Sequence, residues 1–241
     1  MIVKADNIMY EDEQIIVCHK PSGIATQTAK LGQPDMVSSI KNYLKTSYIG
    51  VIHRLDQPVE GILVFGKTKE SAAKLSAQSM EKLYYAVVFA DSAVVKAKDK
   101  DYLKTEFTLV DYLVKNGVDN TSRITEKNDK DAKRAELKYR ILKVAEEDKD
   151  FRNLRMLTEI LLKTGRHHQI RVQMAHAGMP LLGDVKYGSE GSMRKSLEDD
   201  IKEVALCAYS LSFLHPKTGK SMSFSIVPKG EAFRLFLPFT P

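Results

Sequence analysis

The chain has 241 residues, of which 43% are hydrophobic and 28% charged, the ordinary balance of a globular protein. Its apolar runs fall short of the ~20 residues of a membrane span, and its N-terminus is too charged for a signal peptide. We therefore expect a soluble cytoplasmic protein. The 37 Lys and Arg outnumber the 31 Asp and Glu, and the net charge of +6 favours a polyanionic partner such as nucleic acid.

Cys18 and Cys207 are the only two cysteines, and they form no CxxC motif. This pattern indicates neither a zinc site nor a disulfide framework. We expect two free thiols, and a single bridge between them is the alternative.

In the first part of the chain, short apolar runs typical of strands alternate with segments whose apolar residues have helical spacing. Thr68 is suited to cap a helix that has Glu70 in its first turn. The predicted elements are strands at 15–18, 62–65 and 82–89 and helices at 36–44 and 68–80.

The second part of the chain contains more strands than helices. Thr164 is suited to cap a helix that ends near Gly178 and has Arg166 in its first turn. The other expected segments are charged loops or strand edges at 95–105 and 125–134, strands at 135–144, 154–162, 206–214 and 221–227, a glycine-bounded loop at 181–188, a loop or short helix at 189–203, and an apolar piece at 233–239. Many strands, few helices and no regular alternation predict an α+β fold with a largely antiparallel sheet.

The stretch before the strand at 62–65 carries the densest group of candidate functional residues. His53, Arg54 and Asp56 lie within four residues and precede a turn marked by Pro58 and Gly61. Asp56 is therefore expected on a loop held by a rigid strand. Its carboxylate either accepts hydrogen bonds within the turn or serves a reaction, and this stretch alone favours neither.

Other candidates have ordinary explanations as well. Lys20 follows a strand, where it either faces a phosphate or is an exposed turn residue. Tyr84 lies on a strand and belongs either to the sheet packing or to a site. His167, His168 and His176 match no standard metal-ligand spacing, so we expect no metal.

Taken together and in order, five segments resemble the RluA-type family of RNA pseudouridine synthases. They are YEDEQIIVCHKPSG at 10–23, HRLD at 53–56, the K-x-Y motif at 82–84, GRHHQIR at 165–171 and the GMPLLGDVKYG loop at 178–188. The resemblance covers most of the chain. One departure is Val59-Glu60, where the family commonly has Thr-Ser, which removes two hydroxyls and adds a carboxylate.

The resemblance implies that the protein isomerises specific uridines to pseudouridine in structured RNA, ribosomal or transfer RNA, without cofactor or metal. Asp56 would be the essential carboxylate, acting as nucleophile or base, and Arg166 its paired cation. Tyr84 would lie against the uracil, and Arg54 would occupy the space of the flipped nucleotide. Further residues expected to contact the substrate or support the site are His53, Lys82, Ile170, Arg171 and Lys20.

The resemblance also implies the fold, a mixed, largely antiparallel sheet with flanking helices and a central cleft. We expect one catalytic domain over residues 1–241, no N-terminal S4-like domain, and a monomer. One alternative is a non-catalytic RNA-binding protein, although such a protein does not require Asp56, Tyr84 and Arg166. Another is a glycoside-cleaving hydrolase, which normally needs two carboxylates, and Glu60 is the obvious neighbour of Asp56.

Overall fold

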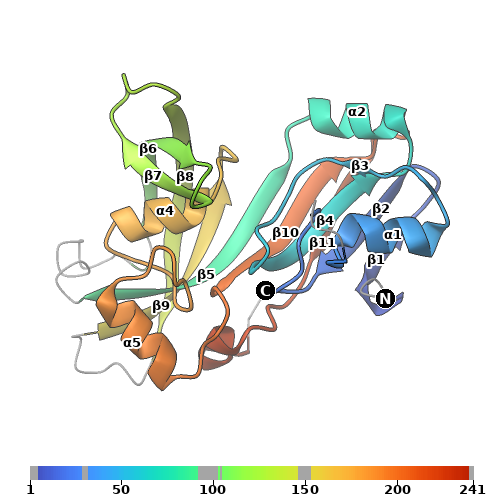
Figure 1. The fold of residues 1–241 in the computed structure, drawn as a ribbon. Coiled ribbons are helices and arrows are strands. Elements are labelled where there is room, and N and C mark those ends of the chain that lie inside the picture. Colours follow the sequence, from blue (N-terminus) through green and yellow to red (C-terminus); the bar gives the residue numbers. More distant parts are fainter. Residues whose placement is uncertain (1–4, 29–31, 92–102, 104, 146–152, 239–241) are drawn as a thin grey trace. The chain divides into compact units, whose positions relative to one another are not determined.

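The computed structural model describes residues 5–28, 32–91, 103, 105–145 and 153–238. The chain divides into two compact units, each built from two separate segments. The first unit comprises Met1–Lys82 and Cys207–Pro228, and the second comprises Leu83–Leu206 and Lys229–Pro241. Figure 1 shows the elements of both.

The first unit is a sheet with two helices. Its strands are β1 (Ile8–Glu11), β2 (Ile15–Lys20), β3 (Gly50–Val51), β4 (Glu60–Gly66), β10 (Leu206–Leu214) and β11 (Ser221–Ser225), and its helical elements are η1 (Ala5–Asn7), α1 (Met36–Leu44) and α2 (Lys69–Ala77). The order β1-β2-β4-β10 is extended by β11 on β10, and β3 pairs with the end of β4. Neighbours run antiparallel except β4 and β10, which are parallel.

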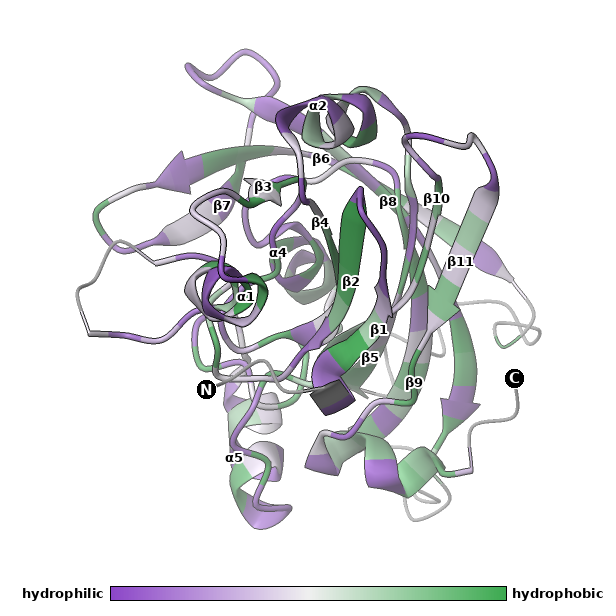
Figure 2. Ribbon diagram, turned by 90° about the vertical axis from the view of Figure 1, so that its right-hand side faces the viewer, coloured by the Kyte–Doolittle hydropathy of each residue, from purple (hydrophilic) through white to green (hydrophobic). Residues whose placement is uncertain are grey.

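The apolar runs of the sequence account for this arrangement. Every residue of β2 and β4 is buried, and β2 is among the most hydrophobic segments in Figure 2. A core cluster combines them with α2 and β10, and consists of Ile15, Val17, Ile62, Val64, Leu75, Leu211 and Phe213. Burial of apolar surface on this scale is the main force that holds such a sheet together.

The second unit is an all-antiparallel sheet, ordered β5-β9-β8-β6-β7. Its elements are β5 (Glu81–Asp91, whose first two residues belong to the first unit), β6 (Glu106–Asn116), β7 (Thr121–Thr125), β8 (Lys133–Val144), β9 (Asn153–Leu162), α4 (Gln169–His176), α5 (Glu190–Glu198) and η2 (Glu231–Phe236). Helix α4 packs on β6 and β7, with Val172 against Leu113 and Ala135.

Most of the predicted elements are confirmed. Helix α1 has the expected bounds, and the Thr68 side chain caps α2 by accepting the Ser71 amide at 3.1 Å. The segment 189–203 forms the short helix rather than only a loop, and both cysteines are free and buried. Strands β6 and β7 were not predicted. The expectation for 95–105 falls largely outside the described residues.

The fold class is also confirmed, since the sheet is mixed, mostly antiparallel and flanked by a few helices. Among the described residues, no helix combines the length and the apolar character needed to cross a membrane.

Candidate active site

Asp56 lies in the turn that leads into β4, and its side chain is half-buried. Its carbonyl accepts the amide of Val59 at 3.0 Å, which closes the turn. Gly61 then adopts φ +150°, and a Cβ at this position would lie 2.4 Å from the Ala208 Cβ. A side chain here would therefore clash with β10, so a glycine is required where the turn joins the sheet.

His53 is partly buried, and its Nε2 atom is inaccessible and has no hydrogen-bond partner. Burial, and to a lesser extent the positive charge of Lys82, lowers the pKa of His53 to about 3. Burial also lowers the pKa of Lys82. His53 is therefore a neutral imidazole at physiological pH, so any contact it makes with a substrate is a hydrogen bond rather than an ion pair.

Lys20 is the last residue of β2 and is fully buried, so the expectation of an exposed turn residue is wrong. Its Nζ donates to three backbone carbonyls, those of Pro21 at 3.0 Å, Ile24 at 2.6 Å and Gln57 at 3.1 Å. An ammonium group has three protons. These contacts favour a role in supporting the Asp56 turn over a contact with an RNA phosphate.

Arg54 is exposed, and its Nη2 donates to Gln27 Oε1 at 3.3 Å.

The side chain of Glu60 is buried, with Oε2 3.5 Å from Nε2 of His19. The Glu60 carboxylate on β4 therefore faces the imidazole of His19 on the neighbouring strand β2. This position does not favour Glu60 as the second carboxylate of a hydrolase.

In the second unit, Tyr84 is 5% exposed and lies opposite Ile160 in the β5–β9 pair. Ile160 is in turn opposite Tyr139, and Tyr139 is opposite Phe107, so the four side chains lie on one face of the sheet. The rings of Tyr139 and Phe107 stack with centroids 5.2 Å apart. Tyr84 thus shares one face of the sheet with the buried side chains of Ile160 and Tyr139.

Arg166 lies in the turn before α4, and the prediction that Thr164 caps this helix is wrong. Helix α4 begins at Gln169, and the capping position is His168 at φ 53°. The Thr164 hydroxyl instead accepts the Glu136 amide at 2.8 Å and donates to Gln169 Oε1 at 2.8 Å. The same Gln169 oxygen accepts the Arg166 amide at 2.9 Å.

The Arg166 side chain is exposed, and its Nε donates to the Arg134 carbonyl at 2.9 Å. This bond holds one edge of the guanidinium against β8. Arg166 is therefore an oriented cation: its backbone amide is bound by the Gln169 side chain, and its guanidinium by the Arg134 carbonyl.

Ile170 and Arg171 are buried in α4, with 5% and 3% exposure. Arg171 Nε donates to Asp184 Oδ2 at 2.7 Å and its Nη2 to Asp184 Oδ1 at 2.6 Å. The guanidinium also lies 5.1 Å from the centroid of the Tyr187 ring. These buried contacts favour a role for Arg171 in supporting the site over a direct contact with RNA.

A residue of the unpredicted strand β7 completes this network. The Ser122 amide donates to the Tyr187 hydroxyl at 2.8 Å, and that hydroxyl lies 2.7 Å from His168 Nδ1. The Ser122 hydroxyl donates to the His167 carbonyl at 2.9 Å. Nothing in the local pattern around Ser122 indicates this role, because it depends on the pairing of β7 with β6.

Asp56, His53, Arg54, Lys82 and Lys20 thus belong to the first unit, whereas the second unit contributes Tyr84, Arg166, Ile170 and Arg171. The ion pair expected between Asp56 and Arg166 joins residues of different units and stays a prediction. No group of three metal-binding side chains occurs within the described ranges, and independence from metal likewise stays a prediction.

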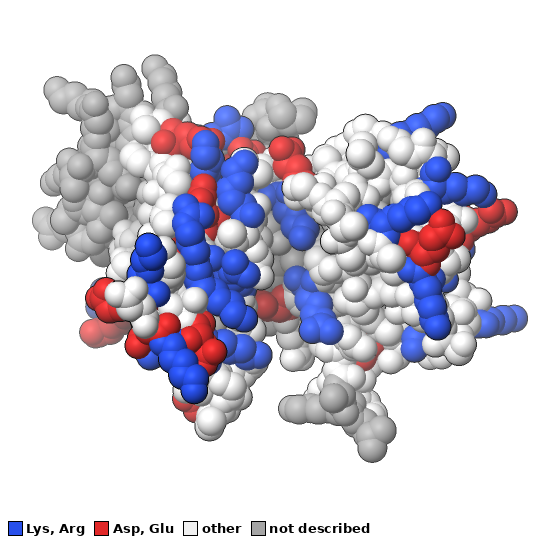
Figure 3. All heavy atoms as spheres, turned by 90° about the horizontal axis from the view of Figure 1, so that it is seen from above, with Lys and Arg blue, Asp and Glu red and all other residues white. Residues whose placement is uncertain are grey.

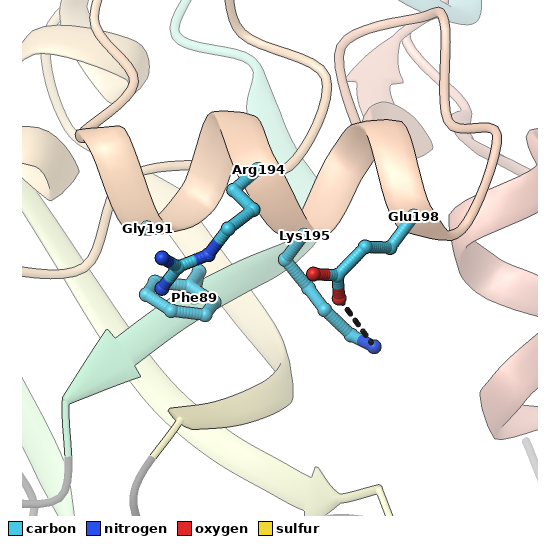
Figure 4. Close-up of a pocket in the computed structure, with 5 residues that line it drawn as sticks. All are labelled: Phe89, Gly191, Arg194, Lys195 and Glu198. Carbon is cyan, nitrogen blue, oxygen red and sulfur yellow. Dashed lines mark ion pairs between the residues drawn. The ribbon is translucent and has the colours of Figure 1, made fainter.

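A pocket of about 410 Å³ lies elsewhere in the second unit, between β5 and α5. Figure 4 shows Phe89, Arg194, Lys195 and Glu198 among the residues that line it, with an ion pair of 3.6 Å between Lys195 and Glu198. Gly191 completes the lining. None of the predicted site residues takes part in it.

Two solved human structures share this fold. The human RNA pseudouridylate synthase domain-containing protein 4 matches 95% of this chain and 92% of its own with a TM-score of 0.69 at 18% identity. The corresponding human domain-containing protein 1 matches 92% and 83% with a TM-score of 0.68 at 17% identity. At this identity the likeness establishes the fold, that of the pseudouridine synthases.

Sequence relatives narrow the class to a family. The model of the RNA pseudouridylate synthase family matches residues 14–176. Ribosomal large subunit pseudouridine synthase C of Buchnera aphidicola is 31% identical over 96% of this chain and 70% of its own length. The tRNA pseudouridine synthase C of Vibrio cholerae is 29% identical over 88% and 86%. The chain belongs to the RNA pseudouridylate synthase family and is an RluA-type enzyme of it.

The share of a relative's length that this chain covers differs from one relative to the next. It covers 66% of the length of ribosomal large subunit pseudouridine synthase D of Vibrio cholerae, at 31% identity over 90% of this chain. By name, these relatives include enzymes of ribosomal RNA and of transfer RNA.

Proposed function

We propose that this protein isomerises uridine to pseudouridine in a structured ribosomal or transfer RNA, with Asp56 as the essential carboxylate. The observation that carries the proposal is the family match over 14–176, a range that includes Asp56, Tyr84 and Arg166. In this reaction the bond between ribose C1′ and uracil N1 breaks and a bond from C1′ to C5 forms. The proton leaves C5 and N1 gains one, so no oxidant, reductant or second substrate is consumed.

Asp56 acts in this scheme as the nucleophile or as the base, and both roles need an ionised carboxylate close to the sugar. Arg166 supplies a fixed positive charge for it. Tyr84 lies against the uracil ring, and its hydroxyl takes part in the late proton transfer. The nucleotide is flipped out of its helix because the reacting atoms are inaccessible while the base is stacked, and Arg54 takes its place.

Exposed cations near Arg166 support binding of the RNA backbone. Figure 3 shows Lys and Arg gathered on the unit that carries β6 to β9, with acidic side chains among them. Lys133 and Arg123 extend from strands paired with β6, and Arg134 is joined to Arg166 by a hydrogen bond. Arg134 pairs with Glu136 at 2.5 Å and Arg123 with Asp129 at 3.6 Å, so part of the charge is locally neutralised.

The proposal is tested by incubating the protein with transcripts of ribosomal and transfer RNA and analysing the nucleosides. Formation of pseudouridine supports the proposal. Free uracil would indicate a hydrolase, and unchanged uridine with tight binding would indicate a binding protein.

The role of Asp56 is tested by Asp56→Asn under single-turnover conditions. Asn keeps the shape and turn preference but removes the charge and the nucleophile, so we expect a folded protein that binds RNA and forms no pseudouridine. Asp131→Asn is the matched control, since Asp131 is an exposed turn residue at φ 63°, a conformation that Asn adopts readily. A folded Asp56→Asn protein with substantial activity would overturn the assignment.

A further inference from the structure

The backbone around Asp56 is held by side chains of a single segment, residues 20–26. Thr26 is 3% exposed, and its hydroxyl accepts the Leu55 amide at 3.1 Å and donates to the Leu55 carbonyl at 3.0 Å. Both backbone groups of the residue directly before Asp56 are therefore bound by one hydroxyl. Such a two-way contact fixes the position and orientation of a peptide more tightly than a single bond.

The residues after Asp56 are held in the same way. The Gln57 carbonyl accepts from Lys20 at 3.1 Å, and the Pro58 carbonyl accepts from the Ser22 hydroxyl at 2.8 Å. In the opposite direction, Gln57 Nε2 donates to the Gly23 carbonyl at 3.0 Å. Contacts on both sides of Asp56 thus restrain the turn along its length.

Helix α1 anchors this segment in turn. The amides of Met36 and Val37 donate to the carbonyls of Ala25 and Thr26 at 3.0 and 3.2 Å. Asp35, at the cap of the helix, accepts the Ser38 amide at 2.6 Å through Oδ1 and the Thr28 amide at 2.9 Å through Oδ2. The support therefore runs without a break from a regular helix, through the segment, to the Asp56 turn.

We infer that Thr26 is a positioning residue for the proposed isomerisation, and that it acts by fixing the Leu55 peptide and hence the Asp56 carboxylate. Lys20 and Ser22 share this role on the far side of the turn. The inference rests on the proposed function of Asp56. A displaced carboxylate would still let RNA bind, because the cations proposed to contact the RNA backbone, Arg123, Lys133 and Arg134, belong to β7 and β8 of the second unit. It would not meet the sugar in a reactive geometry.

The test compares Thr26→Val, which keeps the shape and loses the hydroxyl, with Thr26→Ser, which keeps the hydroxyl. We expect Thr26→Val to slow single-turnover pseudouridine formation by about 10- to 100-fold, since small misplacements of reacting groups have effects of this order. Its Kd for RNA should stay close to that of the wild type. Thr26→Ser should retain most of the rate.

Ser196→Ala is the control for loss of stability alone. The Ser196 hydroxyl is also buried, accepts the Gly183 amide at 2.8 Å and donates to the Ser192 carbonyl at 2.6 Å. This variant should lower the melting temperature about as much as Thr26→Val while leaving the rate unchanged. If Thr26→Val does not fold, Ser22→Ala tests the same support from a less buried position, with a smaller loss of rate expected.

The outcomes separate the two proposals. If the wild type forms no pseudouridine on any transcript, the proposed function fails. If the wild type is active and the folded Thr26→Val or Ser22→Ala protein reacts as fast as Ser196→Ala, the positioning role fails and the proposed function stands. A loss of rate with unchanged Kd supports the inference.

Discussion

Arg171 and Asp184 form a two-point ion pair inside the second unit. Their side chains are 4% and 1% exposed, and the two hydrogen bonds measure 2.7 and 2.6 Å. Asp184 Oδ1 also accepts the amides of Lys186 and Tyr187 at 3.0 and 3.3 Å. The pair therefore joins α4, which follows the Arg166 turn, to the loop at 181–188.

Replacing Asp184 by Asn should destabilise the protein strongly, because it leaves the Arg171 charge buried without a counter-charge. We expect a loss of about 3–5 kcal/mol in the free energy of unfolding, measured in urea. The control is Glu231→Gln, which removes the exposed pair with Arg234 and should cost at most about 1 kcal/mol. Equal losses in the two variants would contradict the structural role of the buried pair.

The imidazole of His53, whose Nε2 atom is buried without a hydrogen-bond partner, should make stability depend on pH. Its pKa is about 3 in the folded protein and about 6.5 in an unfolded chain, so acid favours the unfolded state, which takes up the proton. This penalty is absent above pH 6.5 and grows as the pH falls toward 3. Between pH 7.5 and pH 5 it should reach about 2 kcal/mol relative to His53→Asn. Parallel pH profiles of the two proteins in urea unfolding would contradict the burial of this imidazole.

Tyr84→Phe should bind RNA normally but turn over slowly, because the ring remains and the proposed proton-transferring hydroxyl is lost. Tyr84→Ala should also weaken binding, since stacking on an aromatic ring contributes about 1–3 kcal/mol per base. Single-turnover rates and RNA titrations separate the two effects. Tyr85→Phe is the control on the opposite face of β5, and a fully active Tyr84→Phe would refute the role of the hydroxyl.

Both thiols should be inert in the folded protein at neutral pH. Burial, assisted by the charge of Glu11, raises the pKa of Cys18 to about 12. Burial, and to a lesser extent the negative charge of Glu60, raises the pKa of Cys207 well above its usual range. Since the thiolate is the reactive form, a disulfide reagent should label neither cysteine in the native state and both in urea. Rapid native labelling would contradict this arrangement.

The sequence predicted the parts of the fold whose cause is local. The apolar run of β4 and the Thr68 cap of α2 are examples, since each depends on neighbouring residues. Strands β6 and β7 were not predicted, because their exposed polar and charged residues leave no continuous apolar run of the kind seen in β4. Their conformation follows from pairing with β8 and with each other, which a local pattern does not contain.

The same distinction holds for the candidate site. The turn that carries Asp56 was predicted from Pro58 and Gly61, which act locally. Lys20 contacts Gln57, 37 positions away, and Thr26 contacts Leu55, 29 positions away. The spacing of residues along the chain does not indicate such distant contacts. The Thr164 cap failed for a related reason, because the Glu136 amide of a distant strand engages the hydroxyl.

The first unit is assembled from two segments that the 124 residues of Leu83–Leu206 separate along the chain, with consequences for its synthesis. Strand β10 pairs with β4 through Cys207 and Ala208, opposite Glu60 and Gly61. A ribosome therefore has to translate the 140 codons of residues 67–206, which lie between the end of β4 at Gly66 and Cys207, before this partner exists. Strands β2 and β3 are made before β4 and pair with its other residues. The start of β4, at Glu60 and Gly61, lacks its β10 partner until then and is a site for chaperone binding or for aggregation.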